Sequence, residues 1–252
     1  MDCQPARRLM VNDWLKRIQA VLLPPCCVLC GDGGQPPLLD LCAPCDGDLL
    51  RNSNACVRCA APLPAEASSG LTCGACLKRP PRFDRATVPF RYAYPLDHLV
   101  RDLKYHGRLA YGRVLGTLLA HFLLAEDLPR PDLIVPVPLF PARHRDRGFN
   151  QASEIARPIA DCLHIPIENR LCQRVRPTDD QTALTAAQRR RNVQRAFALT
   201  RRPGVKHVVI LDDVLTTGST VNEIARVFKR SGVRTVSVWA VARAAPNYVS
   251  KV

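Results

Sequence analysis

Apolar and polar positions follow two different periodicities from about residue 85 onward. Four runs are short and apolar, or alternate between apolar and polar, and these patterns predict strands. The runs cover 85–94, 132–138, 207–213 and 235–243. Between them, apolar residues recur at helical spacing over 96–107, 111–124, 150–163 and 220–232. Strands that alternate with helices predict an α/β fold with a mostly parallel sheet covered on both faces.

Three segments depart from this pattern. Residues 1–24 place apolar residues at helical spacing and predict an amphipathic helix, which Pro24 and Pro25 stop. Residues 25–81 are rich in Cys, Gly and Pro and lack long apolar runs, so a core there needs a staple. Residues 82–252 hold the α/β pattern. Within them, the polar and Arg-rich 170–202 segment is too long for an ordinary connection and predicts a functional flap.

Four Cys-x-x-Cys pairs lie in the second segment. They are Cys27 and Cys30, Cys42 and Cys45, Cys56 and Cys59, and Cys73 and Cys76. Each pair can form one knuckle, and two knuckles make a tetrahedral thiolate site that suits Zn²⁺. The alternatives are redox dithiols or an iron–sulfur cluster, whose ligands usually lie closer together in sequence.

Eight cysteine ligands predict two closed zinc sites, which are structural rather than catalytic. We expect the first two pairs to share one ion and the last two pairs the other. An interleaved pairing of the knuckles is the alternative. The two sites together predict a double zinc ribbon over 25–81.

The charge balance of the chain is strongly basic. Lys and Arg outnumber Asp and Glu by 36 to 22, which gives a formal net charge of +14. This charge suits phosphorylated metabolites or nucleic acid, although an Arg-rich proteome would also produce it. The sequence lacks both an apolar run of about 18 residues and the apolar core of a signal peptide. We therefore expect a cytoplasmic protein without a membrane span.

The stretch "VVILDDVLTTGST" (208–220) carries the clearest chemistry. Asp212 and Asp213 end a buried strand, and a turn then leads into a helix whose amino end favours anions. The turn consists of Val214, Leu215, Thr216, Thr217, Gly218, Ser219 and Thr220. Its backbone N–H groups and hydroxyls can hold a phosphate, while the carboxylates accept sugar hydroxyls, so a ribose 5-phosphate would satisfy both. The alternatives for the two acids are a strand-end pair or metal ligands.

This stretch closely resembles the phosphoribosyl-pyrophosphate (PRPP) motif of class I phosphoribosyltransferases. Two longer stretches extend the resemblance: "VPVPLFPARHRDRGFNQA" (135–152) and "RVRPTDDQTALTAAQRRRNVQRAF" (174–197). Together with the Cys-x-x-Cys pairs, they are similar to the ComF family of competence proteins over nearly the whole chain, roughly 24–243.

The resemblance implies a role for each part of the site. Asp212 and Asp213 would be the catalytic pair on the ribose hydroxyls, 214–220 would hold the 5-phosphate, and Mg²⁺ would accompany PRPP. Pro138 and Leu139 match the pyrophosphate loop, and Arg143 and Arg147 would add positive charge there. The 170–202 segment matches the family's mobile hood, with Arg176, Gln181, Arg189 and Asn192 at its recurring positions. The alternatives are a solvated helix start for the two arginines and loop capping for the hood residues.

The same resemblance implies a role in DNA uptake during natural transformation. One hypothesis is phosphoribosyl transfer from PRPP to an unknown nitrogen acceptor. The other is a non-catalytic protein that binds single-stranded DNA or senses PRPP, with DNA-uptake or recombination proteins as partners. Aromatic residues make up only 6% of the chain, so extended base stacking is not evident.

Overall fold

The computed structural model describes residues 24–36, 39–68, 70–177 and 186–244. The chain divides into two compact units, Met1–Leu49 and Leu50–Val252. The first cysteine group lies in the first unit, whereas the second group lies in the same unit as the sheet. The helix predicted over 1–24 falls almost wholly outside the described residues.

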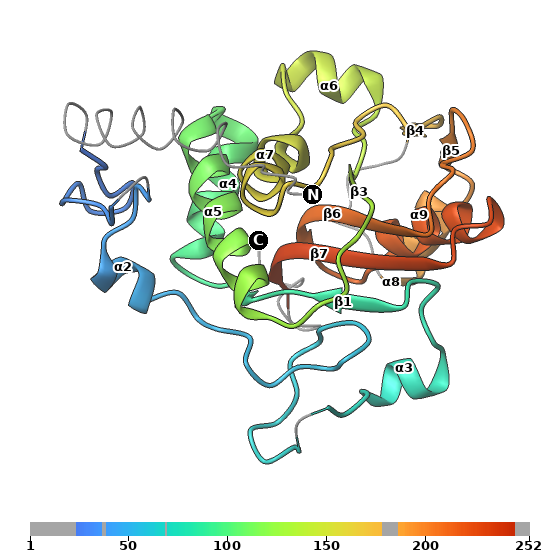
Figure 1. Ribbon diagram of the computed structural model, residues 1–252, viewed down its shortest axis with the longest axis horizontal. Coiled ribbons are helices and arrows are strands. Elements are labelled where there is room, and N and C mark those ends of the chain that lie inside the picture. The colour runs from blue at the N-terminus through green and yellow to red at the C-terminus, as the bar shows by residue number, and fades with distance from the viewer. Residues whose placement is uncertain (1–23, 37–38, 69, 178–185, 245–252) are drawn as a thin grey trace, which may run out of the picture. The chain divides into compact units, whose positions relative to one another are not determined.

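A parallel sheet forms the centre of the second unit (Figure 1). Its strand order is β1-β7-β6-β3, and β2 also pairs with β7. The strands are β1 (Arg85–Thr87), β2 (Phe90–Arg91), β3 (Leu133–Pro136), β6 (His207–Leu215) and β7 (Thr235–Arg243). All of these pairings are parallel, which confirms the predicted fold class. The predicted 85–94 strand is split into β1 and β2 around Val88 and Pro89.

Helices cover both faces of this sheet. They are α4 (Leu96–His106), α5 (Leu109–Ala125), α7 (Gln151–Leu163) and α9 (Ser219–Arg230). Successive strand residues point to opposite faces. Val208 and Ile210 join the core beneath α9, whereas the buried Val209 and Leu211 between them point to the other face, where α5 and α7 pack.

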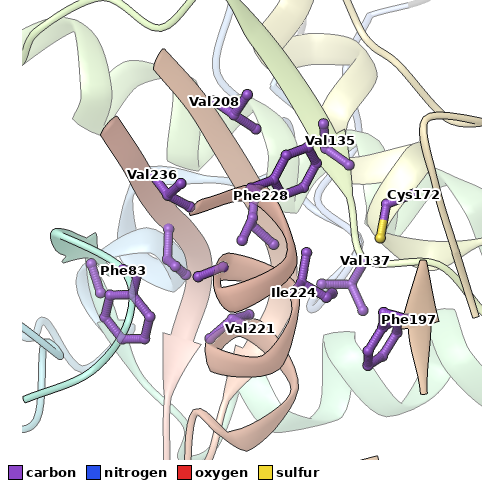
Figure 2. Close-up of a cluster of buried hydrophobic side chains, with 14 of the residues drawn as sticks. Phe83, Val135, Val137, Cys172, Phe197, Val208, Val221, Ile224, Phe228 and Val236 are labelled. Carbon is purple, nitrogen blue, oxygen red and sulfur yellow. The ribbon is translucent and has the colours of Figure 1, made fainter. Parts of the chain in front are cut away.

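The core beneath α9 is aliphatic with a few aromatic rings. Figure 2 shows Val221, Ile224 and Phe228 of α9 facing Val135 and Val208 of the sheet. These three α9 residues are fully buried at a spacing of three and four, which is one face of a helix. Each such side chain contributes about 1.5–3 kcal/mol of transfer free energy on burial.

Other elements had a weak sequence signal or none. A hairpin of β4 (Cys172–Arg174) and β5 (Phe197–Leu199) encloses α8 (Ala186–Val193) within the predicted flap. The remaining helices are α6 (Pro141–Arg147) and two single turns, α2 (Ala43–Gly47) and α3 (Gly74–Lys78). Among the helices that the structure describes, none is both long and apolar enough to cross a bilayer.

Candidate functional site

The carboxyl ends of two neighbouring strands bring the predicted site together. Pro136 at the end of β3 pairs with Leu211 of β6, and the N–H of Val137 donates to the carbonyl of Leu211 at 2.8 Å. Asp212 and Asp213 follow Leu211, while Pro138 and Leu139 follow Val137. The acid pair and the predicted pyrophosphate loop therefore occupy the same edge of the sheet, where α/β folds bind their ligands.

The two acids have different environments. Asp213 is only 3% exposed, and its Oδ2 lies 2.5 Å from the Nζ of Lys104, which α4 contributes. Its other oxygen accepts from the N–H of Val214 at 2.8 Å. Asp212 is half-buried, and its Oδ1 accepts from the N–H of Asp213 at 3.0 Å. Both oxygens of Asp213 thus contact groups of the protein, and Asp212 is the more accessible carboxylate.

These environments shift the pKa values of the two aspartates in opposite directions. Burial alone would raise the pKa of Asp213, but the charge of Lys104 outweighs burial and lowers that pKa below its ordinary value. Burial and then repulsion from Asp213 raise the pKa of Asp212 to about 8. In return, Asp213 raises the pKa of Lys104 against the effect of burial. The ligand-free site therefore holds one firmly ionised carboxylate and one that ionises only near neutral to alkaline pH.

The turn after β6 is shorter than the predicted 214–220, because Val214 and Leu215 still belong to β6 and α9 begins at Ser219. Gly218 has φ +71° and forms the N-cap of α9. The Oγ1 of Thr217 lies 2.8 Å from the Oγ of Ser219 and also accepts from the N–H of Ser219 at 3.3 Å. A Cβ at Gly218 would meet only the side chain of Leu215, at 3.8 Å. The left-handed φ, and not crowding within the protein, is therefore the reason for glycine here.

Asn150 fixes the segment after β3. Its Nδ2 donates to the carbonyl of Val137 at 3.1 Å, and its Oδ1 accepts from the N–H of Ala152 at 3.0 Å, which caps α7. Arg147 donates to the Oε1 of Gln151 at 2.7 Å and stacks over the ring of Tyr105 at 5.9 Å. Arg147 thus braces α6 against α4 and α7.

A basic cleft of about 660 Å³ opens beside Pro138 and Leu139. Its ionisable lining comes from α6, α7, the strand β4 and the segment just before β4: His144, Arg145, Glu154, Arg157, Arg170 and Arg174. Burial and the charge of Arg143 lower the pKa of Arg174, while the charge of Asp212 opposes them. Arg174 therefore lies within electrostatic reach of the acid pair. Neither Arg174 nor Lys104 stands out as a site residue in the sequence pattern.

The base of the hood is anchored to the protein body. Arg176 donates to the carbonyls of Asn192 and Gln194, at 3.0 and 2.7 Å. The N–H of Arg195 donates to the Oε1 of Glu223 on α9 at 2.7 Å. Of the other predicted hood residues, Arg189 lies on α8 and Gln181 lies outside the described residues. Arg176 and Asn192 thus close the loop across its base.

The cysteines form two groups, and the pairing is sequential. Cys27, Cys30, Cys42 and Cys45 form one group, and Cys56, Cys59, Cys73 and Cys76 form the other. All sulfur atoms of a group lie within 4.8 Å of one another. A tetrahedral site with Zn–S bonds of about 2.3 Å has S···S edges of about 3.8 Å. The Cys30–Cys42 and Cys59–Cys73 sulfurs lie 3.6 and 3.7 Å apart, so the thiolates fit structural zinc.

Backbone amides prepare one sulfur of each group as a thiolate. Burial raises the pKa of the Cys56 thiol, but N–H donors led by Cys73, at 3.2 Å, lower it to about 7. N–H donors led by Cys42 lower the pKa of Cys27 to about 6 in the same way. Such hydrogen bonds are the usual support around zinc–thiolate centres.

Comparison with known proteins gives the family. A double zinc ribbon domain matches residues 18–77, and a phosphoribosyl transferase domain matches 147–250. The DNA utilization protein YhgH of Escherichia coli O157:H7 is 39% identical over 207 residues, which cover 81% of this chain and 90% of that protein. Competence protein F of Haemophilus influenzae is 36% identical over 181 residues, 68% of this chain and 78% of that protein. The chain belongs to the ComF family.

A solved structure gives only a distant likeness to this ComF-family chain. A hypoxanthine phosphoribosyltransferase from Staphylococcus aureus matches 54% of this chain and 75% of its own, at 13% identity and a TM-score of 0.34. The sequence relatives and the two domains, together with the parallel sheet, establish the phosphoribosyltransferase-type fold with its N-terminal double zinc ribbon.

Proposed function

We propose that this ComF-family protein binds PRPP with Mg²⁺ at the carboxyl edge of its sheet and acts in DNA uptake. One observation carries the proposal: Asp212 and Asp213 near the end of β6, and the turn that follows β6, lie at the same edge of the sheet as the Pro138–Leu139 segment after β3. A phosphate, a ribose and a pyrophosphate can then be held by one edge. The names of the relatives, DNA utilization protein and competence protein, support the biological role. We place this activity in the cytoplasm, where thiols remain reduced.

Different residues of the chain would bind different parts of the ligand. N–H groups of the turn that precedes α9 would receive the 5-phosphate. Asp212, once ionised, would accept the ribose hydroxyls, while Lys104 keeps Asp213 charged beside it. Bound Mg²⁺ would supply charge neutralisation at the pyrophosphate. Arg174 and the cleft arginines would face the same anionic ligand from the hood side.

Calorimetry with Mg²⁺ and PRPP tests this proposal. Wild type should bind, and Asp212→Asn should weaken binding about 10-fold or more because it removes one charge-assisted acceptor. Asp161→Asn is the matched control, since Asp161 is exposed near the far end of α7. No binding at millimolar PRPP would refute the proposal, and so would equal affinity of wild type and Asp212→Asn.

We further propose that the site transfers the phosphoribosyl group to a nitrogen acceptor. Pyrophosphate would leave the anomeric carbon, and the acceptor nitrogen would form the new bond and lose its proton to solvent. Positioning and charge stabilisation would suffice, so no covalent nucleophile is needed. A pyrophosphate-release assay with a panel of nucleobases and nucleotides separates turnover from sensing. Release above that of Asp212→Asn supports transfer, whereas binding without release favours a PRPP sensor.

Binding of single-stranded DNA is the second candidate function, and the basic cleft favours it. Arg145 and Arg170 line this cleft and are exposed, so they can meet backbone phosphates. The net charge of +14 would strengthen the attraction. Removing both arginines should weaken binding and lower the salt slope, d log K/d log[salt], by about 1.4, or about 0.7 for each phosphate contact.

Fluorescence anisotropy with a labelled oligothymidine measures this slope. Arg230→Ala/Arg234→Ala, at the exposed end of α9 and just beyond it, is the control because it also removes two positive charges, away from the cleft. An unchanged slope in Arg145→Ala/Arg170→Ala, or a flat salt response in wild type, would remove the cleft as the DNA site.

A further inference from the structure

Arg243 connects a cysteine of the second zinc group to the phosphate turn. It is the last residue of β7 and is only 7% exposed. Its Nε donates to the carbonyl of Cys59 at 3.0 Å, while Nη1 donates to the carbonyls of Leu215 and Ala244, at 2.7 and 2.8 Å, and also to that of Thr216. One guanidinium thus holds a zinc knuckle and the first residues of the turn.

Both ends of this connection are held firmly. On the knuckle side, the carbonyl of Arg58 accepts from the N–H of Ala86 in β1 at 2.9 Å. Asn52 donates to the carbonyl of Ala60 at 3.0 Å. On the turn side, Leu215 is the last residue of β6 and pairs with Arg243 in the sheet. A movement of the knuckle would therefore disturb the carbonyls of Leu215 and Thr216, to which Arg243 donates.

Charge gives this contact its strength. Carbonyl oxygens are the acceptors in the bonds of Arg243 described above, so they satisfy its N–H groups without neutralising its charge. Four thiolates around one Zn²⁺ leave a net charge of about −2. Arg243 is buried and donates to the backbone of Cys59, one of the four ligands, so the zinc centre is a nearby countercharge for its guanidinium.

We propose that Arg243 is a positioning residue that couples zinc binding at the Cys56–Cys76 group to the shape of the phosphate turn, and hence to PRPP affinity. This inference rests on the proposed PRPP binding. Loss of zinc would leave the Cys59 knuckle held by its hydrogen bonds, among them those through Arg58 and Ala60, and would remove the countercharge. Arg243 would then be a less fixed donor for the Leu215 and Thr216 carbonyls. The Cys27–Cys45 group, in the other unit, should have no such effect.

Hydrogen exchange without ligand tests the coupling independently of PRPP. Cys73→Ser should empty the second group, and the amides of 214–220 should exchange about 10-fold faster or more, a usual size for coupled sites. Cys45→Ser is the matched control, because Cys45 is also half-buried and belongs to the last pair of its own group. Unchanged exchange of 214–220 in Cys73→Ser would overturn the inference, whether or not PRPP binds.

Two further measurements keep the inference testable should Cys73→Ser fold poorly. Arg243→Lys keeps the charge but cannot make all four bonds, so it should speed exchange at 214–220 while the protein retains two zinc ions. Reciprocity requires Mg²⁺–PRPP to raise the affinity for one of the two zinc ions by the same factor as that zinc raises PRPP affinity, which competition with a chromogenic chelator at equilibrium measures. Normal exchange in Arg243→Lys, or an equal gain in affinity for both ions, would contradict the coupling. Failure of PRPP to bind wild type would refute only the proposed function.

Discussion

Replacement of Lys104 by Met should expose how the acid pair is stabilised. Lys104 and Met have similar length and apolar stems, so the substitution mainly removes the ammonium group. The Oδ2 of Asp213, 2.5 Å from Nζ in the wild type, would then face a methyl group. Asp213 is 3% exposed, so water cannot replace the lost partner without opening the site.

The magnitude follows from burial. Removing one partner of a fully buried ion pair costs about 3–5 kcal/mol. The Lys104 side chain is 23% exposed, against 4% for that of Asp213, so we expect a loss at or just below the bottom of this range. A loss of about 2–3 kcal/mol would lower the urea midpoint by about 1–1.5 M, for an m-value of about 2 kcal/mol/M.

The pH dependence gives the loss a signature. Lys104 holds the folded-state pKa of Asp213 below its unfolded value, so its stabilisation is complete above the unfolded pKa and is lost as pH falls through the folded pKa. In Lys104→Met, burial alone should raise the pKa of Asp213. The stability difference between wild type and variant should therefore be largest at pH 8 and shrink toward pH 4.5.

Urea unfolding followed by far-ultraviolet circular dichroism measures this difference at both pH values. The double variant Lys104→Met/Asp213→Asn is the control, because it removes the stranded charge and should recover most of the loss at pH 8. A variant as stable as wild type at pH 8 would refute the reasoning, as would a double variant no more stable than Lys104→Met.

Three other predictions concern metal, pH and packing. Purified protein should contain close to two zinc ions per chain, and Cys42→Ser should lose one of them while the sheet keeps its melting temperature. Elemental analysis that finds less than one zinc ion per chain in folded protein would contradict this. Affinity for Mg²⁺–PRPP should rise between pH 6 and pH 9, because Asp212, with its pKa raised to about 8, must ionise to accept hydroxyls. An affinity that does not change with pH in calorimetry would count against that role of Asp212. Gly116→Ala should destabilise the protein by about 2 kcal/mol or more, although alanine has the better helix propensity, because the new Cβ would collide with the carbonyl of Ile155 in α7. A variant with the wild-type urea midpoint would exclude that clash.

The sequence was sufficient for the regular elements because their patterns are local. Residues 208–211 of β6 form an unbroken apolar run, and α9 buries Val221, Ile224 and Phe228 at helical spacing. The cysteine spacing predicted two zinc groups, and the structure decides for the sequential pairing. For the sheet, the sequence predicts only that the strands are mostly parallel. It does not predict which strands are neighbours, because strand pairing depends on contacts between segments that are far apart in the chain.

The sequence could not reveal the long-range partners of the site. Lys104 lies on the polar side of a helical pattern and looks solvated, yet it meets an acid more than a hundred residues later. The position of Arg243 at the end of a buried strand gives no sign of its bonds to Cys59 and Leu215. The one local hint for Lys104 was that a buried acid pair needs a countercharge from somewhere.

The electrostatic balance of the sheet edge explains why a metal–phosphate ligand suits it. Two adjacent carboxylates repel each other, and the charge of Lys104 outweighs burial at Asp213 but does not outweigh burial and repulsion at Asp212, which stays reluctant to ionise. A cation that arrives with the ligand would complete the ionisation, because opposite charge lowers a carboxylate pKa. The phosphates of such a ligand would then meet the turn before α9 and the arginines of the cleft, so an anion without a metal would satisfy only half of the site. PRPP without Mg²⁺ should therefore bind more weakly than the pair. The difference in affinity should widen as pH rises toward the range where Asp212 is ionised, because a cation that lowers the pKa of a carboxyl binds more tightly once that proton is lost.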